Sequence, residues 1–375
     1  MLDSPSQLLL RHDVVQDDTW LVNAQDSLGQ QHQLNSHFFY ADTYYKYGRA
    51  EDTFGPSLSC DGPCVGSNEA LREDSRQSPY PGSGAGRRVE PLDDASNHRS
   101  VVIYVPKEKP LFWMIMANLA ACLEAGTRLY LVGSNKGGIK SLIKHLPPQW
   151  QSARKVASGN HCLLFETERS AVAAQPFTLR DYTTKYPVAL SDPAADVLTV
   201  TNLPGVFSDQ RLDLGTAVLL EYLHGLKRSN TGLRVLDFAC GNGVIGAFLR
   251  QHFAVSELVA CDISAMALYC SEQTLAAQGL ASKYQVVASD GLHNVSGHFD
   301  WIVSNPPFHA GQKTDYRIAE QFFADAAKQL TRSGRLTVVA NSFLGYNALL
   351  ERHFRNVNEV LNTRKYKIIE AAHPF

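Results

Sequence analysis

Short apolar runs, each closed by residues that break regular structure, recur along the second half of the chain. One such run, Trp301–Val303, is followed closely by Asn305-Pro306-Pro307-Phe308. An apolar run of this length is typical of a buried parallel strand, and the prolines must end it. Each proline fixes its own φ angle and pushes the residue before it towards extended geometry. The pattern therefore predicts that Asn305 and Pro306 are held stiffly at the carboxyl end of a strand.

This loop suits a flat exocyclic amine as its substrate. The amide oxygen of Asn305 and the carbonyl oxygen of Pro306 could accept the two N–H bonds of the amine, while Phe308 could stack on the ring that carries it. Two fixed acceptors would stabilise the positive charge that develops on the nitrogen as it attacks. The alternative is a plain proline turn beside a core phenylalanine, because N-P-P-F also occurs by chance.

A second strand-and-turn pattern lies upstream, in L-R-V-L-D-F-A-C-G-N-G-V-I-G from Leu233 to Gly246. Gly241 and Gly243 allow a tight turn whose backbone N–H groups approach a ligand at a helix N-terminus. The spacing differs from the G-x-G-x-x-G of a dinucleotide fold, so no pyrophosphate site is indicated. Asp237, inside the predicted turn, could hold an ammonium group or an ordered water.

Two further acidic residues end the next two predicted strands. Asp262 follows Leu258–Cys261, where a carboxylate can accept hydrogen bonds from both hydroxyls of a ribose. Asp290 comes shortly after the strand Tyr284–Val287, where a carboxylate can accept from an adenine amine. Each acid alone is more often a helix cap or a turn residue. Three acids at successive strand ends, all before N-P-P-F, are difficult to attribute to chance.

The order strand, proline, helix, glycine, strand occurs twice. The predicted elements are Val101–Val105, Leu111–Leu123 and Arg128–Val132 in the first copy, and Trp301–Val303, Ile318–Leu330 and Leu336–Ala340 in the second. Only the second copy carries the asparagine and the aromatic residue. The sequence thus predicts an α/β fold of two tandem Rossmann-like domains with largely parallel sheets, the N-terminal one a degenerate duplicate.

The length of 375 residues also favours two domains. We expect the first to span residues 1–170, a proline-punctuated linker to span 171–197, and the second to span 198–375. Within the first domain, residues 55–97 are rich in Gly, Pro, Ser and charge. Such a segment cannot bury enough apolar area to fold alone, so it is predicted to be a flexible surface insert.

The composition bears on where in the cell the protein works and on whether it holds disulfides or metals. No apolar run reaches the roughly 18 residues of a membrane span, and the N-terminus lacks a signal-peptide pattern, so neither a membrane helix nor a signal peptide is predicted. A cytoplasmic location and a monomeric state are expected. The seven cysteines are scattered, which suits reduced thiols. Cys60 and Cys64 form a C-x3-C without a second pair, and no metal site is predicted.

The net charge of −2 does not indicate a nucleic-acid binder, so such binding would need a local patch. One candidate lies between Ala125 and Phe165, which contains no acidic residue. There Lys136, Lys140 and Lys144 recur every four residues, and a helix would line them on one face. Such a stripe suits a phosphate backbone, although a solvated helix face is the ordinary explanation.

From about Leu203 to the C-terminus these motifs resemble the class I S-adenosylmethionine-dependent methyltransferases. N-P-P-F marks the branch that methylates planar amine nitrogens. Finer matches resemble the ribosomal RNA small subunit methyltransferase C family; they are Leu8–His12, Tyr104–Lys107, Leu203–Ser208, Leu212–Gly215, Ser304–His309 and Val339–Asn341. In one departure, the first glycine of the family's D-x-G-C-G turn is Ala239 here. The insert is a second departure.

The resemblance implies a 16S rRNA guanine-N2 methyltransferase that uses S-adenosyl-L-methionine and acts on the small ribosomal subunit or its precursor. Its first domain would lack a cofactor site and bind RNA. Carried over, it assigns cofactor binding to Asp237, Ala239, Gly241, Gly243, Asp262 and Asp290, and substrate chemistry to Asn305, Pro306 and Phe308. A paired guanine would first have to swing out of its duplex.

Two other functions remain open at this stage. The substrate could be a protein glutamine, methylated at N5 as by release-factor methyltransferases. The chain could also be a non-catalytic RNA-binding assembly factor that kept the fold. The acid-free stripe and the second domain favour RNA, and the intact acids and N-P-P-F favour an enzyme.

Overall fold

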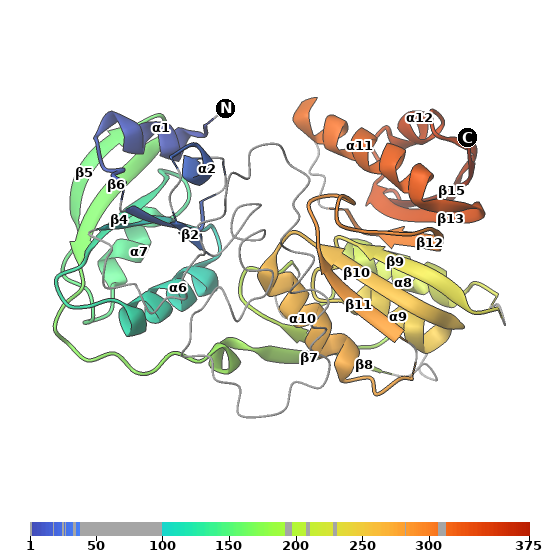
Figure 1. The fold of residues 1–375 in the computed structure, drawn as a ribbon, viewed down its shortest axis with the longest axis horizontal. Helices are drawn as coiled ribbons and strands as arrows, with labels where there is room; N and C mark the ends of the chain where they lie inside the picture. The colour runs from blue at the N-terminus through green and yellow to red at the C-terminus, as the bar shows by residue number, and fades with distance from the viewer. Residues whose placement is uncertain are drawn as a thin grey trace. The chain divides into compact units, whose positions relative to one another are not determined.

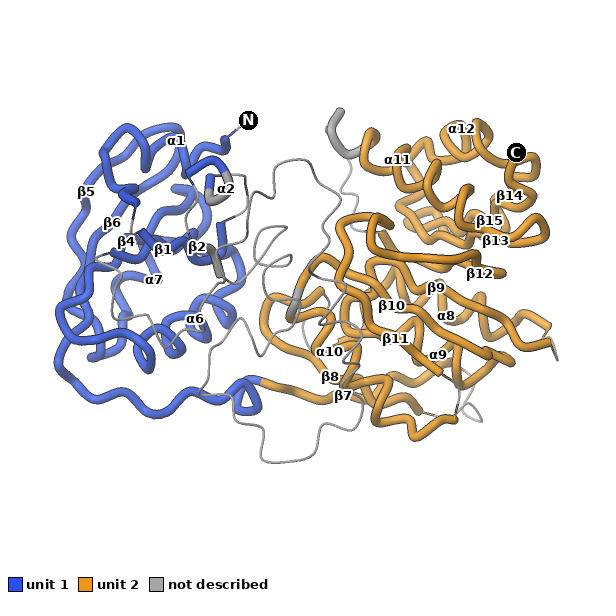
Figure 2. Tube along the Cα trace, in the orientation of Figure 1, with its two compact units in different colours: residues 1–182 blue, residues 183–375 orange. Residues whose placement is uncertain are grey.

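A computed structural model describes residues 2–17, 19–24, 26, 28–32, 35–37, 100–191, 197–207, 211–227, 231–281, 283–306 and 313–375. The chain divides into two compact units, residues 1–182 and residues 183–375 (Figure 2). The division falls inside the predicted linker. The predicted insert at 55–97, with Cys60 and Cys64, lies outside the described residues, as does Phe308.

The second unit is built on a seven-stranded sheet of order β11-β10-β9-β12-β13-β15-β14 (Figure 1). Its strands are β9 (Leu233–Phe238), β10 (Val255–Asp262), β11 (Lys283–Ala288), β12 (Phe299–Ser304), β13 (Leu330–Asn341), β14 (Phe354–Asn362) and β15 (Tyr366–Pro374). The first five strands in this order, β11, β10, β9, β12 and β13, pair with one another in parallel. Strand β15 is antiparallel to both β13 and β14. The carboxyl ends of β9 to β12 therefore meet at one edge of the sheet, where open α/β folds bind their ligands.

Helices connect these strands. They are α8 (Leu214–His224), α9 (Val244–His252), α10 (Ala265–Ala276), α11 (Lys313–Gln329) and α12 (Tyr346–Leu350). Helix α9 begins where the glycine turn predicts, whereas α11 begins five residues before the predicted Ile318. Below the site, Phe238 of β9 stacks on Phe322 of α11 with ring centroids 3.9 Å apart, which fixes the helix after the N-P-P-F loop against the sheet.

The predicted linker contains β7 (Thr184–Val188), which pairs antiparallel with β8 (Leu198–Asn202) as a β-hairpin of the second unit. The hairpin is tied to α10, because the backbone N–H of Thr201 donates to Thr274 Oγ1 at 3.0 Å. It also reaches the glycine turn. The buried amide of Asn242 donates to the Tyr186 hydroxyl at 2.9 Å and to Asn202 Oδ1 at 3.3 Å.

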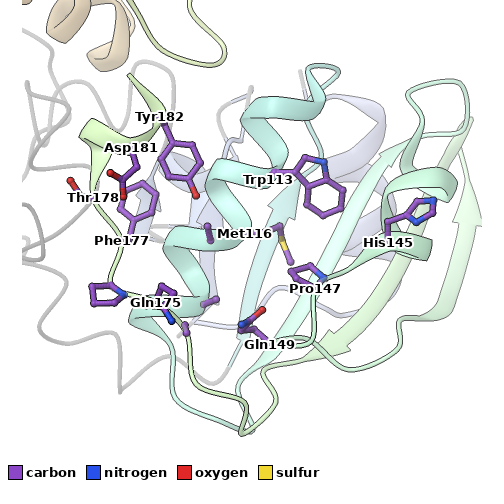
Figure 3. A pocket seen from close by; sticks show the side chains of 14 residues that line it. Trp113, Met116, His145, Pro147, Gln149, Gln175, Phe177, Thr178, Asp181 and Tyr182 are labelled. Atoms are coloured by element: carbon purple, nitrogen blue, oxygen red, sulfur yellow. The ribbon is translucent and has the colours of Figure 1, made fainter. Parts of the chain in front are cut away.

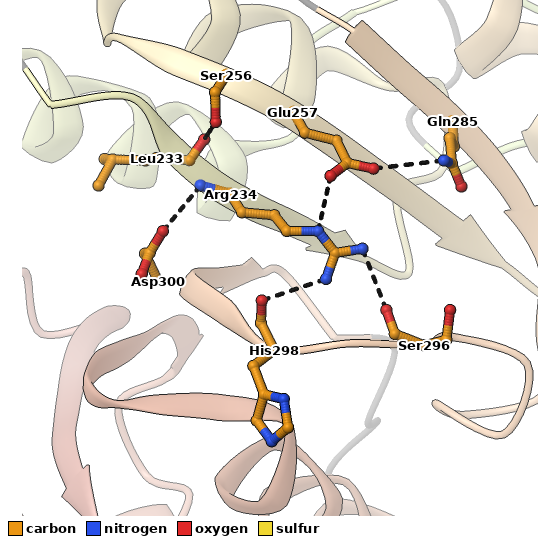
Figure 4. A network of polar contacts seen from close by, with 8 residues as sticks. All are labelled: Leu233, Arg234, Ser256, Glu257, Gln285, Ser296, His298 and Asp300. Carbon is orange, nitrogen blue, oxygen red and sulfur yellow. Dashed lines mark hydrogen bonds and ion pairs between the residues drawn. The ribbon is translucent and has the colours of Figure 1, made fainter.

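The opposite, amino-terminal edge of this sheet is held by the side chain of Arg234 (Figure 4). Its Nε donates to Glu257 Oε2 at 2.8 Å, and its two terminal nitrogens donate to the carbonyls of His298 and Ser296, each at 3.2 Å. The guanidinium also lies 4.4 Å from the ring centroid of Phe299. This network joins β9, β10 and β12 away from the predicted site and is therefore structural.

The first unit contains a six-stranded sheet of order β2-β1-β3-β4-β6-β5. Its elements are α1 (Ser4–Arg11), β1 (Thr19–Val22), α2 (Leu28–His32), β2 (Asn35–His37), β3 (Ser100–Tyr104), α6 (Lys109–Cys122), β4 (Arg128–Ser134), α7 (Ile139–Leu142), β5 (Arg154–Gly159) and β6 (Cys162–Glu168). Strands β1 to β4 pair in parallel, and β6 is antiparallel to β4 and β5. The second unit repeats this arrangement as β10-β9-β12-β13-β15-β14, so the predicted duplication is confirmed.

The register of the two sheets shows how the first copy differs. In the second unit, Asp237 pairs with Val303, three residues before Pro306. At the matching place in the first unit, Val22 pairs with Ile103, three residues before Pro106. In the first unit, the position equivalent to that of Asn305, directly before the proline, is occupied by Val105. The first unit thus has the strands of the fold with apolar residues at two of the positions on which the predicted chemistry depends.

Candidate active site

The turn after β9 has an unusual backbone. Ala239, Gly241 and Gly243 have φ angles of +54°, +55° and +77°, all in the left-handed region. A Cβ on Gly243 would lie 2.8 Å from Cα of Ser271 in α10, so this glycine is also needed for close packing. A Cβ on Gly241 would meet nothing within 4 Å, so space is open above that residue. Ala239 adopts the left-handed conformation although it is not a glycine.

Asp237 lies within β9, paired with Val303 and Ala260, and not in the turn as predicted. It is fully buried, and its Oδ2 accepts from the backbone N–H of Gly246 at 2.8 Å. Oδ1 has no hydrogen-bond partner among the described residues. The net effect of its surroundings is to raise the pKa of this carboxyl to about 7. Burial is the main cause of the rise, the hydrogen bond from the Gly246 N–H opposes it, and the charge of Asp262 adds to it.

An unpaired buried oxygen is costly, at about 1–3 kcal/mol, and so points to a missing partner. An ammonium group of a ligand, or an ordered water, fits this oxygen. Sequence reasoning overlooked Gly246. Because this residue has no side chain, its backbone N–H can come close enough to bond to Asp237. A Cβ there would lie 3.1 Å from Asp237 Oδ2 and 2.8 Å from the side chain of Leu258.

Asp262 ends β10, as predicted, and is half-buried. Its Oδ2 accepts from the N–H of Gly241 at 3.0 Å, and its Oδ1 accepts from the N–H of Ser264 at 2.9 Å. Burial raises the pKa of this carboxyl, and the surrounding backbone N–H groups lower it. Each carboxylate oxygen has room for a second donor. The residue therefore joins the glycine turn to α10 and retains acceptor capacity for two hydroxyls.

Asp290 follows β11 in an exposed turn. The preceding residue, Ser289, is buried, and its N–H donates to the carbonyl of Asp262 at 3.0 Å. This bond ties the end of β11 to the end of β10. The three predicted acids therefore come from neighbouring strands β9, β10 and β11 and lie towards the same edge of the sheet.

Asn305 follows β12 at this edge and is half-buried. Its Nδ2 donates to Asp213 Oδ2 at 3.1 Å and to Thr216 Oγ1 at 2.8 Å. An ionised carboxylate can only accept hydrogen bonds, so the amide nitrogen must face Asp213. The amide oxygen of Asn305 then points away from both partners. Pro306, also half-buried, follows directly.

Asp213 has two tasks in this arrangement. It is the N-cap of α8, where its Oδ2 also accepts from the backbone N–H of Thr216 at 3.0 Å. A Cβ on Gly215 would lie 3.0 Å from that oxygen and 3.2 Å from the ring of Tyr366, so this glycine makes room for both. Sequence reasoning did not single out Asp213 or Thr216 as functional. The only sequence signal for them was an acidic residue followed three residues later by a threonine, which is typical of a helix N-cap and does not indicate a functional role.

The three lysines of the predicted stripe are all exposed. The regular helix expected beneath them is wrong, because α7 covers only Ile139–Leu142 and continues as a 3-10 helix over Ile143–His145. Lys136 precedes the helix, separated from it by Gly137 and by Gly138, whose φ of +83° interrupts a helical backbone. Lys136, Lys140 and Lys144 thus share a segment without sharing one helical face.

The first unit also contains a cleft of about 430 Å³, lined mainly by α6 and by the segments around Pro147 and 174–182 (Figure 3). Trp113, Phe177 and Tyr182 contribute aromatic rings to it, and the last two stack with centroids 5.2 Å apart. Of the predicted catalytic and cofactor residues that the structure describes, none lines this cleft.

The described cysteines, Cys122, Cys162, Cys240, Cys261 and Cys270, are all free thiols. Among the described residues no cluster of three or more potential metal ligands occurs. Within the same residues, no helix combines the length and apolar character that crossing a membrane would need.

Comparison with known proteins agrees with this geometry. The family model "Methyltransferase small domain" matches residues 197–370, and "Methyltransferase small domain N-terminal" matches residues 83–186. Proteins named ribosomal RNA small subunit methyltransferase C are similar in sequence. The one from Pseudoalteromonas translucida (strain TAC 125) is 39% identical over 72% of this chain and 76% of its own length. The one from Shewanella sp. (strain MR-4) is 41% identical over 74% and 78%.

A solved structure has the same fold. It is the T. thermophilus 16S rRNA N2 G1207 methyltransferase in complex with AdoMet and guanosine, which superimposes with a TM-score of 0.71 over 99% of this chain and 92% of that chain, at 22% identity. The agreement over nearly the full length extends to the two-unit architecture. The identity and coverage of the curated relatives show that the chain belongs to the ribosomal RNA small subunit methyltransferase C family.

Proposed function

We propose that this protein transfers a methyl group from S-adenosyl-L-methionine to the exocyclic N2 of a guanine in 16S rRNA. The observation that carries the proposal is the orientation of Asn305, whose amide oxygen is left for an N–H donor because Asp213 and Thr216 hold its nitrogen. The names of its relatives support the RNA substrate, and the T. thermophilus protein's name supports the guanine equivalent to G1207.

The acids at the sheet edge fit the proposed cofactor. Asp237 Oδ1 would accept from its ammonium group, Asp262 from its ribose hydroxyls, and Asp290 from its adenine amine. Ala239, Gly241 and Gly243 would let the backbone approach it. When bound, S-adenosyl-L-methionine supplies an electrophilic methyl group that needs little activation by the protein.

The remaining chemistry falls to the N-P-P-F loop. Asn305 Oδ1 and the Pro306 carbonyl would accept the two N–H bonds of the guanine amine and so orient its nitrogen. As this nitrogen attacks, both oxygens stabilise its growing positive charge, and the proton leaves afterwards. These two hydrogen bonds are stronger in the transition state than in the ground state, as catalysis requires. Phe308 would stack on the flipped base and help to hold it.

The first unit would then contribute to RNA binding. We infer that the exposed Lys136, Lys140 and Lys144 contact phosphates, which the absence of acidic residues between positions 125 and 165 favours. Replacing all three by alanine should flatten the salt dependence of RNA binding by up to about 0.9 per lost contact in log–log slope. A ribosomal particle as the substrate, a monomeric state and a cytoplasmic location remain predictions of the sequence.

The test is methyl transfer from labelled S-adenosyl-L-methionine, with 16S rRNA and small subunits from cells lacking this protein offered separately. Nuclease digestion and mass spectrometry should find the label in N2-methylguanosine. Label in a protein glutamine would support the first alternative. A protein that binds the RNA but not the cofactor would be the assembly factor instead.

A further inference from the structure

Two loops stand beside Asn305 at the same edge of the sheet. Strand β12 pairs with β13 through Ser304 and Val338, and β13 pairs with β15 through Asn341 and Tyr366. Asn341 is thus three residues beyond the level of Ser304, or roughly 10 Å at 3.3 Å per residue. The loop that follows β13 and the turn that precedes β15 therefore lie beyond the proposed chemistry on its carboxyl side.

The loop after β13 presents an aromatic ring to solvent. Phe343 is 70% exposed, whereas the next residue, Leu344, is 4% exposed. The N–H of Leu344 donates to the carbonyl of Asn341 at 3.0 Å and closes the loop on both sides of Phe343. A single exposed hydrophobic residue needs no explanation by itself. This one is held out by an ordered loop next to a substrate site.

The turn before β15 presents cations. The backbone of Arg364 has a φ of +71°, a region that costs an L-residue about 1–2 kcal/mol and usually selects glycine or asparagine. Its N–H donates to Asn362 Oδ1 at 2.9 Å, and the N–H of Thr363 donates to the carbonyl of Tyr366 at 2.8 Å. The ammonium of Lys365 lies 5.2 Å from the Tyr366 ring centroid. The turn is therefore ordered, with exposed cationic side chains near its tip.

The loop and the turn form one surface. The N–H of Ser342 donates to the carbonyl of Lys365 at 3.0 Å, and its hydroxyl donates to the carbonyl of Arg364. The acids nearest in sequence are both paired with other cations, Glu359 with Lys367 at 3.4 Å and Glu370 with Arg335 at 3.9 Å. Among the described residues, the Arg364 guanidinium has no hydrogen bond or ion pair within the protein.

We propose that Phe343, Arg364 and Lys365 bind the RNA next to the target guanine, with the ring stacked on a flanking base and the cations on its phosphates. Aromatic rings beside cations are how proteins hold single-stranded nucleic acid without reading its sequence. A flipped guanine leaves its neighbours unstacked, and such a platform would hold them. The proposal rests on the proposed function and adds a second RNA contact, on the catalytic unit itself.

The test compares Phe343→Ala and Arg364→Gln with matched controls from the opposite edge of the sheet. Phe375→Ala removes a ring that is 77% exposed, and Arg332→Gln removes an exposed cation. Arg364→Gln keeps the strained backbone, so only the charge changes. Affinity for a 16S rRNA transcript is measured by filter binding at several salt concentrations, and methyl transfer is measured at saturating RNA.

Phe343→Ala should weaken RNA binding by roughly 5–150-fold, the range found when one stacked base loses its ring. Arg364→Gln should lower the salt slope by about 0.7, as for one phosphate of a single strand. Cofactor affinity should not change, and the control variants should bind like the parent. If both variants bind RNA as the controls do, the platform is refuted. A parent that binds RNA but methylates neither the transcript nor small subunits from cells lacking this protein would instead refute the proposed function.

Discussion

Replacing Asp213 by serine tests whether the orientation of Asn305 matters. Serine is as good an N-cap as aspartate, so α8 should keep its capping bond to Thr216. The serine hydroxyl lies one bond closer to the backbone than Asp213 Oδ2 and carries no charge, so we expect it not to hold the Asn305 amide nitrogen. Thr216 Oγ1 would remain as the other partner, and a hydroxyl can donate or accept. The amide of Asn305 could then turn its nitrogen towards the substrate.

The size of the effect follows from the bond that is lost. Hydrogen bonds to charged groups contribute about 1.5–3 kcal/mol. The separation of 3.1 Å between Asn305 Nδ2 and Asp213 Oδ2 is longer than usual for a charge-assisted bond, which places it in the lower half of that range. A loss of about 1.5–2 kcal/mol corresponds to a rate lower by roughly 10–30-fold.

The assay is single-turnover methyl transfer with saturating RNA and cofactor. Asp213→Ser should be slower by that factor, and its melting temperature should fall by only a few degrees, because the same lost bond also contributes to stability. In a background that already carries Asn305→Ala, the same substitution should have almost no further effect on the rate, because the group it orients is gone. If the two substitutions are additive, or if Asp213→Ser retains the parental rate, Asp213 does not act through Asn305.

Three other predictions concern the cofactor side of the site. Gly243→Ala should destabilise the protein by about 2–5 kcal/mol in chemical denaturation, because it adds a backbone clash to left-handed strain, whereas Gly241→Ala should cost only the strain, about 1–2 kcal/mol. Asp237 has a pKa raised to about 7 in the folded protein, above its ordinary 3.8, so the cofactor-free protein should lose stability as pH rises between those values. Asp237→Asn should therefore stabilise it at pH 8 and do so progressively less towards acidic pH; an equal effect at both ends would contradict the burial argument. Asp262→Ala should weaken cofactor binding by about 1–3 kcal/mol in calorimetry, and an unchanged affinity would remove it from the ribose site.

The sequence predicted those features of the site that depend on local pattern. Apolar runs and the breakers after them placed Asp262 and Asn305 at strand ends, and parallel pairing then brought those ends together. The partners of Asn305 could not be found in this way. Asp213 and Thr216 lie 92 and 89 residues away in the chain, and only the packing of α8 against the sheet brings them into contact.

Two errors have local causes. Periodic spacing of lysines predicted a helix over Lys136, but it gave no weight to the two glycines that delay the helix until Ile139. Prolines predicted a linker through residues 171–197, and yet Pro187 lies in β7, one strand of a two-stranded hairpin. A strand at the edge of a sheet tolerates proline because not every N–H there is needed for pairing. The hairpin in turn supplies Tyr186 to the glycine turn, a contact that no sequence pattern marks.

The central claim is tested most directly in cells that lack this protein. Mass mapping of their 16S rRNA should show one guanine without its N2-methyl group. Restoring the parental gene should return the methyl group, whereas a copy with Asn305→Ala, made at the same level, should leave that guanine largely unmethylated because its rate falls by roughly 10²–10³. Full methylation in cells that lack the protein, or full restoration by Asn305→Ala, would contradict the account.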